Sequence, residues 1–316
     1  MRLLNTKNLI MLFHVVPSKV WFKKTLEVIN RFYHFIPIQD IERYYFDNYK
    51  LTSCCHICFD DGDTTVYENA LPVLRSMNLP ATIFVSPKIV KEEVNYWFQE
   101  KSFYDDTDIK RIIAESHGVR YLDIARYSVG SIFKTMKLKD IQRIIIEMRP
   151  RGVHSFISRK NINLTQLYEM QKSNIISFGA HTMNHPILSN ESDEDSRIEI
   201  ETSINELSEL INEEVRYFAY PDGTYNISFN EREVNILREN NIKLAFTTEN
   251  RFIHPSDDPL LVPRNSLSYG NRPFVAMKVL TGSYWERLRS IILMHNTERE
   301  EIIKLKQIFR NSCVKD

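Results

Sequence analysis

Two aspartates stand side by side at the end of an apolar segment, and two histidines follow much later in the chain. Asp60 and Asp61 end the segment SCCHICFDD (53–61), and His181 and His185 lie in GAHTMNHP. Adjacent carboxylates repel one another and reduce stability unless a cation or a shared proton compensates. Two imidazoles and one carboxylate are the three protein ligands of many hydrolytic zinc enzymes, in which water takes the fourth position. The four residues therefore indicate a divalent metal site with hydrolytic chemistry.

The spacing of the two histidines supports this interpretation. His181 and His185 are four residues apart, which places both imidazoles on one side of a helical turn. Each residue type also has a purely structural use, because aspartates at strand ends cap helices or form turns and histidines pack in cores. His56, inside the same apolar segment as Cys58, is expected to be such a packed residue. The two pairs occurring together favour the metal site.

The elements that position these residues follow from the alternation of apolar and helical segments. The predicted strands are NLIMLFHVV (8–16), SCCHICFDD (53–61), PATIFVS (80–86), IISFGAH (175–181), VRYFAYP (215–221) and KLAFTT (243–248). Strands separated by helices imply βαβ units and a mostly parallel sheet or barrel. In such folds the catalytic groups lie at the carboxyl ends of the strands. The polar residues at or just beyond a predicted strand end are His14, Asp60, Asp61, His181, His185 and Asp222.

The chain is long enough to bury a sizeable core, with 316 residues of which 43% are hydrophobic. We expect one domain over residues 1–316, with a helical insertion at about 93–172 and a C-terminal helical extension at about 283–316. The insertion is rich in charges and shows no strand periodicity. Its aromatic residues, among them Tyr96 and Trp97, suit either a core or the stacking of sugar rings.

Composition limits the partners and the compartment. Basic and acidic residues both number 41, so no overall charge favours nucleic acid or an anionic membrane. Three of the four cysteines lie in one predicted strand, where they cannot build a disulfide framework, and a reducing compartment is expected. The apolar run near the N-terminus is too short to span a bilayer. These features predict a cytoplasmic protein without a membrane span, and nothing in the sequence sets an oligomeric state.

Three motifs, in order along the chain, resemble those of a known enzyme family. ICFDDG (57–62), FGAHTMNHPILS (178–189) and FAYPDGTYN (218–226) resemble the first three motifs of the polysaccharide deacetylases, carbohydrate esterase family 4 or the NodB homology domain. The resemblance covers roughly residues 50–275. It implies a metal-dependent hydrolase that removes an N-acetyl or O-acetyl group from a sugar of a bacterial glycan or glycan precursor. We therefore expect an α/β fold, a distorted (β/α) barrel with mostly parallel strands and a helical insertion.

The resemblance assigns roles to the matching residues. It makes Asp61, His181 and His185 the metal ligands and Asp60 the general base. The family's metal is usually zinc, with cobalt or nickel in some members. Pro221 and Asp222 lie in the third motif, where the backbone N–H that follows the proline helps to form the oxyanion hole; such a donor contributes about 3 kcal/mol in a typical hydrolase.

The family's general acid is a histidine in an L-x-H motif at a strand end, and two segments of this chain contain that motif. His14 ends the first predicted strand, whereas His295 lies in a segment with the pattern of a charged amphipathic helix. We prefer His14, because a strand end is where an active-site histidine belongs. This choice is similar to members in which the last strand has been circularly permuted to the N-terminus.

Two positions depart from the family pattern and keep other functions open. Ala219 stands where many members carry an arginine that orients the base, and Arg264 is the candidate substitute. Asp222 replaces the usual aromatic residue, and its carboxylate would oppose a developing oxyanion unless it turns outward. The alternatives are a catalytically weak or inactive glycan-binding relative and a metal amidohydrolase of a non-sugar amide. The intact Asp60 beside a metal-ligand set favours the deacetylase.

Overall fold

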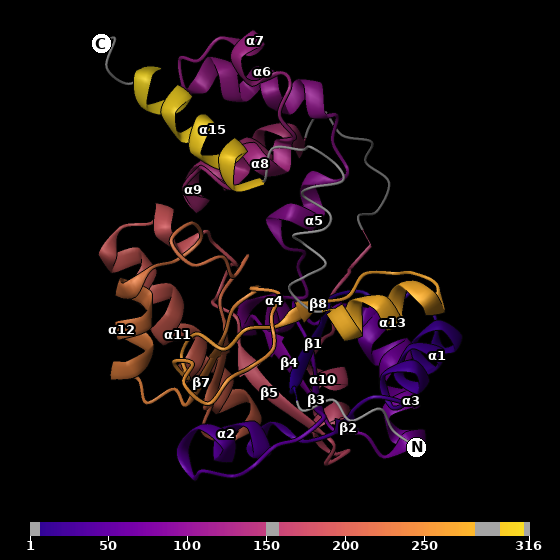
Figure 1. Cartoon of the computed structure of the whole chain (residues 1–316). Coiled ribbons are helices and arrows are strands. Elements are labelled where there is room, and N and C mark those ends of the chain that lie inside the picture. Colours follow the sequence, from indigo (N-terminus) through magenta and orange to yellow (C-terminus); the bar gives the residue numbers. More distant parts are fainter. Residues whose placement is uncertain (1–6, 150–157, 282–297, 313–316) are drawn as a thin grey trace.

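The computed structural model describes residues 7–149, 158–281 and 298–312, and Figure 1 shows its element order. Its centre is an eight-stranded sheet in which every ladder between named strands is parallel. In spatial order the strands are β7 (Leu244–Phe246), β6 (Tyr217–Ala219), β5 (Ile176–Ala180), β4 (Ala81–Val85), β3 (Cys54–Phe59), β1 (Leu9–Phe13) and β8 (Asn265–Ser266), and β2 (His34–Phe35) also pairs with β3.

The sheet curls so that its two edge regions are linked by one short segment. Phe246 of β7 forms a parallel bridge with Val262, and Asn265 of β8 pairs with Met11 of β1. Residues 262–266 therefore contact both ends of the sheet. The expected distorted (β/α) barrel with mostly parallel strands is confirmed.

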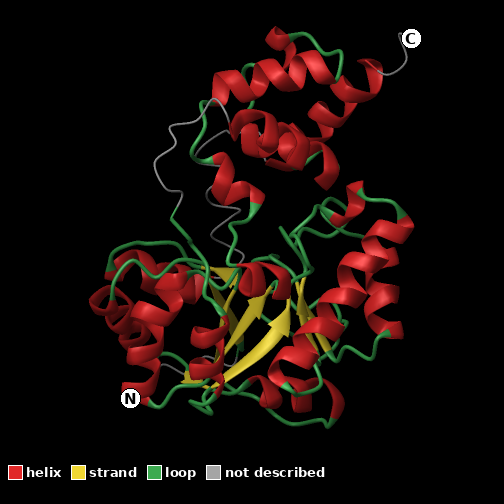
Figure 2. Cartoon of the chain, turned by 180° about the vertical axis from the view of Figure 1, so that it is seen from behind, coloured by secondary structure: helices red, strands yellow, loops and turns green. Residues whose placement is uncertain are grey.

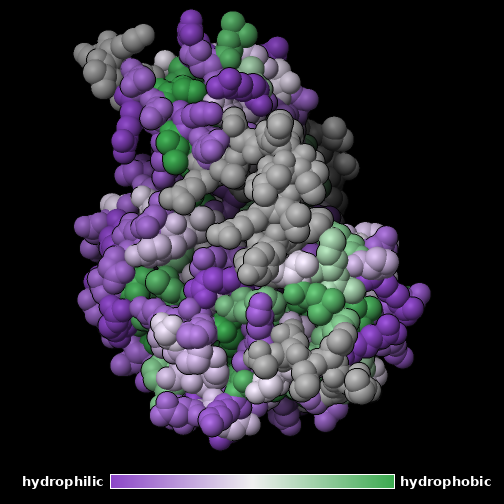
Figure 3. All heavy atoms as spheres, viewed as in Figure 1, coloured by the Kyte–Doolittle hydropathy of each residue, from purple (hydrophilic) through white to green (hydrophobic). Residues whose placement is uncertain are grey.

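Helices surround the sheet and follow its strands, as the helix and strand colours of Figure 2 show. Outside the β4–β5 connection, the described helices around the sheet are α1 (Lys19–Ile29), α2 (Ile38–Phe46), α3 (Leu71–Met77), α11 (Asp193–Ile211), α12 (Glu231–Glu239) and α13 (Arg272–Thr281). Helix α15 (Glu298–Ser312) packs instead against α8, away from the sheet. A π-helical turn (Val66–Ala70) precedes α3. No helix of the described ranges is long and apolar enough to cross a membrane. In the view of Figure 3, hydrophilic residues cover most of the visible described surface.

The connection between β4 and β5 contains helices in place of strands. They are α4 (Pro87–Glu92), α5 (Trp97–Lys101), α6 (Asp106–Ser116), α7 (Tyr121–Ile124), α8 (Val129–Phe133), α9 (Leu138–Met148) and α10 (Leu164–Gln171). Helices α6 to α9 share an apolar cluster that also contains Leu305 of α15. In Figures 1 and 2 this group stands beyond the carboxyl ends of the strands. The division into one domain with an insertion and an extension stays a prediction.

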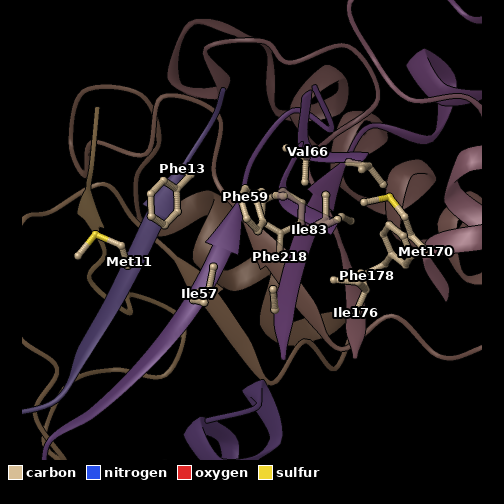
Figure 4. Close-up of a cluster of buried hydrophobic side chains, with 14 of the residues drawn as sticks. Met11, Phe13, Ile57, Phe59, Val66, Ile83, Met170, Ile176, Phe178 and Phe218 are labelled. Atoms are coloured by element: carbon tan, nitrogen blue, oxygen red, sulfur yellow. The ribbon is translucent and has the colours of Figure 1, made fainter. Parts of the chain in front are cut away.

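The central strands are apolar throughout because both of their faces are buried. Alternate residues enter two different clusters: Met11 and Phe13 of β1 pack in the cluster drawn in Figure 4, whereas Leu12 packs with Cys58 in a second cluster. This alternation is the two-residue period of a β-strand. His56 lies on the same face as Cys58, buried, with Nδ1 2.9 Å from the Ile36 carbonyl oxygen. Asp60 continues that face beyond the strand end.

Gly179 of β5 occupies a position with no room for a side chain. A Cβ there would lie 2.5 Å from Phe84 Cε1 and 2.8 Å from the Tyr217 carbonyl oxygen. We predict that Gly179→Ala lowers the free energy of unfolding in urea by about 1–3 kcal/mol, because the core must shift. Gly130→Ala is the control, since its Cβ would meet only Ser128 Oγ at 3.7 Å, and it should gain up to about 1 kcal/mol of helix propensity. Equal stabilities of the two variants would contradict the prediction.

Candidate active site

The sheet brings the two pairs of polar residues together at the carboxyl ends of adjoining strands. Asp60 and Asp61 directly follow β3, and His181 directly follows β5. Asp61 Oδ1 lies 3.5 Å from His181 Nε2 and 3.6 Å from His185 Nε2. The left-handed backbone at Asp61, with φ of +67°, turns the chain immediately after Asp60, so the two carboxylates face different partners.

The turn that joins the two histidines is not the expected helical turn. Thr182 and His185 have φ of +61° and +57°, which is the left-handed region, and the His185 N–H donates to Thr182 Oγ1 at 3.0 Å. The imidazoles meet because the chain reverses locally between them. The helical expectation was wrong because an i, i+4 spacing does not report the handedness of the backbone.

Glu199 of α11 holds this turn in place. Its Oε2 accepts the backbone N–H groups of Met183 at 3.0 Å and Asn184 at 2.9 Å, and its Oε1 accepts Asn184 Nδ2 at 2.6 Å. Burial raises the pKa of Glu199 against these donors. The sequence analysis missed this residue, because Glu199 lies in an acidic stretch typical of a solvated helix start. Its place beside Ile200 on the buried face of α11 is the one signal that pointed to it.

The donor atoms of Asp61, His181 and His185 fit a divalent metal. Asp61 Oδ1 is buried and has no hydrogen-bond partner among the described residues. His181 Nδ1 donates to the Ala219 carbonyl oxygen at 2.7 Å. Because the proton of the neutral imidazole is then on Nδ1, Nε2 has a free lone pair on the side of Asp61. Ligands about 2.1 Å from a tetrahedral zinc ion lie about 3.4 Å apart, close to the separations found here.

Asp60 forms a separate, buried ion pair with Arg264. Arg264 Nη1 and Nη2 donate to the two carboxylate oxygens at 2.6 and 2.8 Å, and both side chains are almost completely buried. Arg264 Nε donates to the Thr247 carbonyl oxygen at 3.0 Å. Burial favours the neutral acid, but the charge and hydrogen bonds of Arg264 outweigh it, so the pKa of Asp60 is lowered. Asp60 therefore stays ionised in the interior.

Ala219 packs in the same apolar cluster as two aromatic rings that lie near Arg264. These rings, of Phe84 and Phe246, lie 5.5 and 5.8 Å from the Arg264 guanidinium. The contact proposed from the sequence between Arg264 and Asp60 is thus present in the structure.

His14 lies on the same edge of the sheet. It directly follows β1, is exposed, and is among the charges that lower the pKa of Asp60 and of Asp61. His295, the other candidate acid, lies outside the described residues.

Pro221 and Asp222 form the loop that follows β6. Asp222 has φ of +59°, and its carboxylate is held by the Lys134 ammonium and the Ser228 hydroxyl. Within the described ranges no group accepts the backbone N–H of Asp222. The acidic side chain, in contrast, already has protein partners.

Comparison with known proteins identifies the family of the chain. The family model described as Polysaccharide deacetylase matches residues 48–245, more than half of the chain. The chain belongs to the polysaccharide deacetylase family. No curated protein matches the chain.

Solved structures show the same fold as this polysaccharide deacetylase at low sequence identity. The deacetylase PplD of Streptococcus pyogenes, solved in complex with acetate, is 19% identical with a TM-score of 0.59, covering 87% of this chain and 98% of its own. IcaB from Ammonifex degensii is 20% identical with a TM-score of 0.60, covering 88% and 99%. The BpsB deacetylase domain from Bordetella bronchiseptica is 14% identical with a TM-score of 0.53, covering 83% and 96%.

Aromatic residues of α5 and the residue before it enclose one side of the site in this polysaccharide deacetylase. The rings of Tyr96 and Phe98 lie 5.6 and 4.9 Å from the His185 ring, and Trp97 Nε1 donates to the His185 carbonyl oxygen at 2.9 Å. Burial, with the nearby His181, lowers the pKa of His185 to about 4. A neutral imidazole is the form that binds a metal. From the sequence, these aromatic residues suited either a core or the stacking of sugar rings. In the structure they pack against the proposed metal ligand His185.

The Asp60–Arg264 pair gives a stability prediction. Arg264→Met leaves a buried carboxylate without its cation and should lower the free energy of unfolding by about 3–5 kcal/mol. Asp60→Asn/Arg264→Met removes both charges, so we expect the double variant to lose less than the two single losses together, by about 1.5 kcal/mol or more. Urea unfolding of the four proteins measures this coupling. Additive losses would show that the pair is not energetically coupled.

Proposed function

We propose that this member of the polysaccharide deacetylase family is a metal-dependent hydrolase that removes an N-acetyl or O-acetyl group from a sugar of a bacterial glycan or glycan precursor. The observation that carries the proposal is that the two adjacent carboxylates have different partners. Asp60 is ionised and fixed by Arg264, while Asp61 Oδ1 has no hydrogen-bond partner among the described residues and lies within 3.6 Å of two imidazole nitrogens. A binding module has no need of an ionised base beside a metal-ligand set.

Asp61, His181 and His185 are the proposed ligands, for zinc first and for cobalt or nickel as alternatives. When bound there, the metal supplies a Lewis acid that polarises the acyl carbonyl and lowers the pKa of water toward neutrality. His181 is oriented for this task by its hydrogen bond to Ala219, and Glu199 fixes the turn that presents His185. Such outer contacts set the direction of the ligand lone pairs.

The remaining steps use side chains and backbone of this chain. Asp60, held ionised by Arg264, takes the proton from the attacking water. The backbone N–H of Asp222 donates to the oxyanion of the tetrahedral intermediate. Protonated His14 then donates to the leaving nitrogen or oxygen, which releases acetate and the deacetylated sugar. Exposure of His14 suits an acid that must be reprotonated in every turnover.

Two features support further parts of the proposal. β1 lies in the sheet between β3 and β8, and this supports the interpretation that the family's last strand stands at the N-terminus of this chain. Arg264 contacts Asp60 and Lys134 pairs with Asp222, so neither Ala219 nor Asp222 argues for an inactive relative. The cytoplasmic location stays a prediction from the cysteine pattern.

Acetate release tests the proposal. Metal-free protein supplied with zinc, cobalt or nickel should release acetate from N-acetylated oligosaccharides, and Asp60→Asn should lower kcat at least about 100-fold because the base is lost. His14→Ala should lower kcat about 100-fold for amide substrates, where the leaving group needs a proton. His254→Gln is the control, since His254 is exposed and its hydrogen bonds go to Ser256 and Asp257, which are not residues of the site.

Metal-independent release, or release unaffected by Asp60→Asn, would refute the mechanism. Release from non-sugar amides alone would move the protein to the amidohydrolase alternative. Metal binding at Asp61 without any release would favour a glycan-binding relative.

A further inference from the structure

A cation from the helical β4–β5 connection reaches the loop beside the candidate site. Lys134 is the C-cap residue of α8, and its ammonium pairs with one oxygen of the Asp222 carboxylate, while the Ser228 hydroxyl donates to the other. The side chains of Lys134 and Asp222 are only 24% and 14% exposed. The pair is therefore shielded from solvent, unlike most surface ion pairs of the chain.

The place of Lys134 is fixed by contacts to the same edge of the barrel. Asn190 Nδ2 donates to the backbone oxygens of Lys134 at 2.9 Å and Met136 at 3.0 Å, and Glu191 accepts the Leu138 N–H at 2.7 Å. The turn between α8 and α9 is thereby anchored to the segment that follows the two histidines. These contacts between the helical connection and the barrel position the Lys134 ammonium beside Asp222.

Asp222 needs a neutralising partner for a specific reason. Its own backbone N–H is the proposed donor to the oxyanion, and a carboxylate on the same residue as that donor opposes a developing negative charge. Asp222 lies only three residues after Ala219, whose carbonyl oxygen accepts the hydrogen bond from the proposed metal ligand His181 at 2.7 Å. An unpaired carboxylate here would therefore weaken the stabilisation of the oxyanion.

We propose that Lys134 is a positioning residue of the active site, which neutralises Asp222 so that the N–H of Asp222 can stabilise the oxyanion. The inference rests on the deacetylation proposed above. It assigns a function to the helical connection, which supplies the charge that compensates for an acidic residue in the third motif.

A charge cycle separates neutralisation from simple structural support. We expect Lys134→Met to lower kcat about tenfold with KM changed less than about threefold, and Lys134→Arg to retain kcat because the charge is kept. Asp222→Asn should raise kcat, and Lys134→Met/Asp222→Asn should recover kcat to within about threefold of the wild type. A merely structural ion pair is lost in the double variant too, so recovery there reports the charge. Lys91→Met, which breaks the 2.8 Å ion pair with Glu206 away from the site, is the control and should not change kcat.

The affinity for acetate gives a readout that does not depend on turnover. Titration of the zinc-loaded proteins with acetate should show about tenfold weaker binding in Lys134→Met and recovery in the double variant. A double variant as slow and as weak in acetate binding as Lys134→Met would overturn the proposal. If the wild type releases no acetate from any substrate, the deacetylase proposal fails, and the acetate affinities still decide whether Lys134 neutralises Asp222.

Discussion

The structure depends on one constraint, the burial of two adjacent carboxylates. Asp60 and Asp61 are both largely shielded from water, and two anions at that separation are strongly destabilising without cations. The protein meets the first charge with its own guanidinium from Arg264, which enters the barrel from the far end of the chain. The second charge, on Asp61 Oδ1, has no such partner among the described residues and faces two imidazoles. A divalent metal bound by Asp61 and the two imidazoles would therefore neutralise this second charge and also supply the hydrolytic chemistry.

The parallel sheet explains how residues far apart in sequence satisfy this constraint. All the strand ends that carry polar residues point to one edge, so β1, β3, β5 and β6 present His14, the aspartates, His181 and the Asp222 loop together. The helical β4–β5 connection covers that edge and adds Trp97 and Lys134. The candidate site therefore combines residues at the strand ends with contacts from this helical connection.

The sequence predicted the strands and the polar pairs because both signals are local. Apolar runs of five or six residues buried on two faces leave a continuous pattern, and the Asp60–Asp61 pair and His181 follow directly at the ends of such runs. The two-residue strands β2 and β8 are too short for any periodicity to show. The left-handed turn at Thr182 and the partners of Glu199 and Lys134 depend on contacts between distant segments, which residue spacing does not encode.

Anomalous diffraction at the zinc edge from zinc-soaked crystals tests the central claim most directly. We predict one strong peak about 2.1 Å from Asp61 Oδ1 and from one nitrogen each of His181 and His185, with Asp60 still paired to Arg264. No peak at these residues, or a zinc ion that draws Asp60 away from Arg264 into its ligand set, would contradict the division of roles between the two carboxylates.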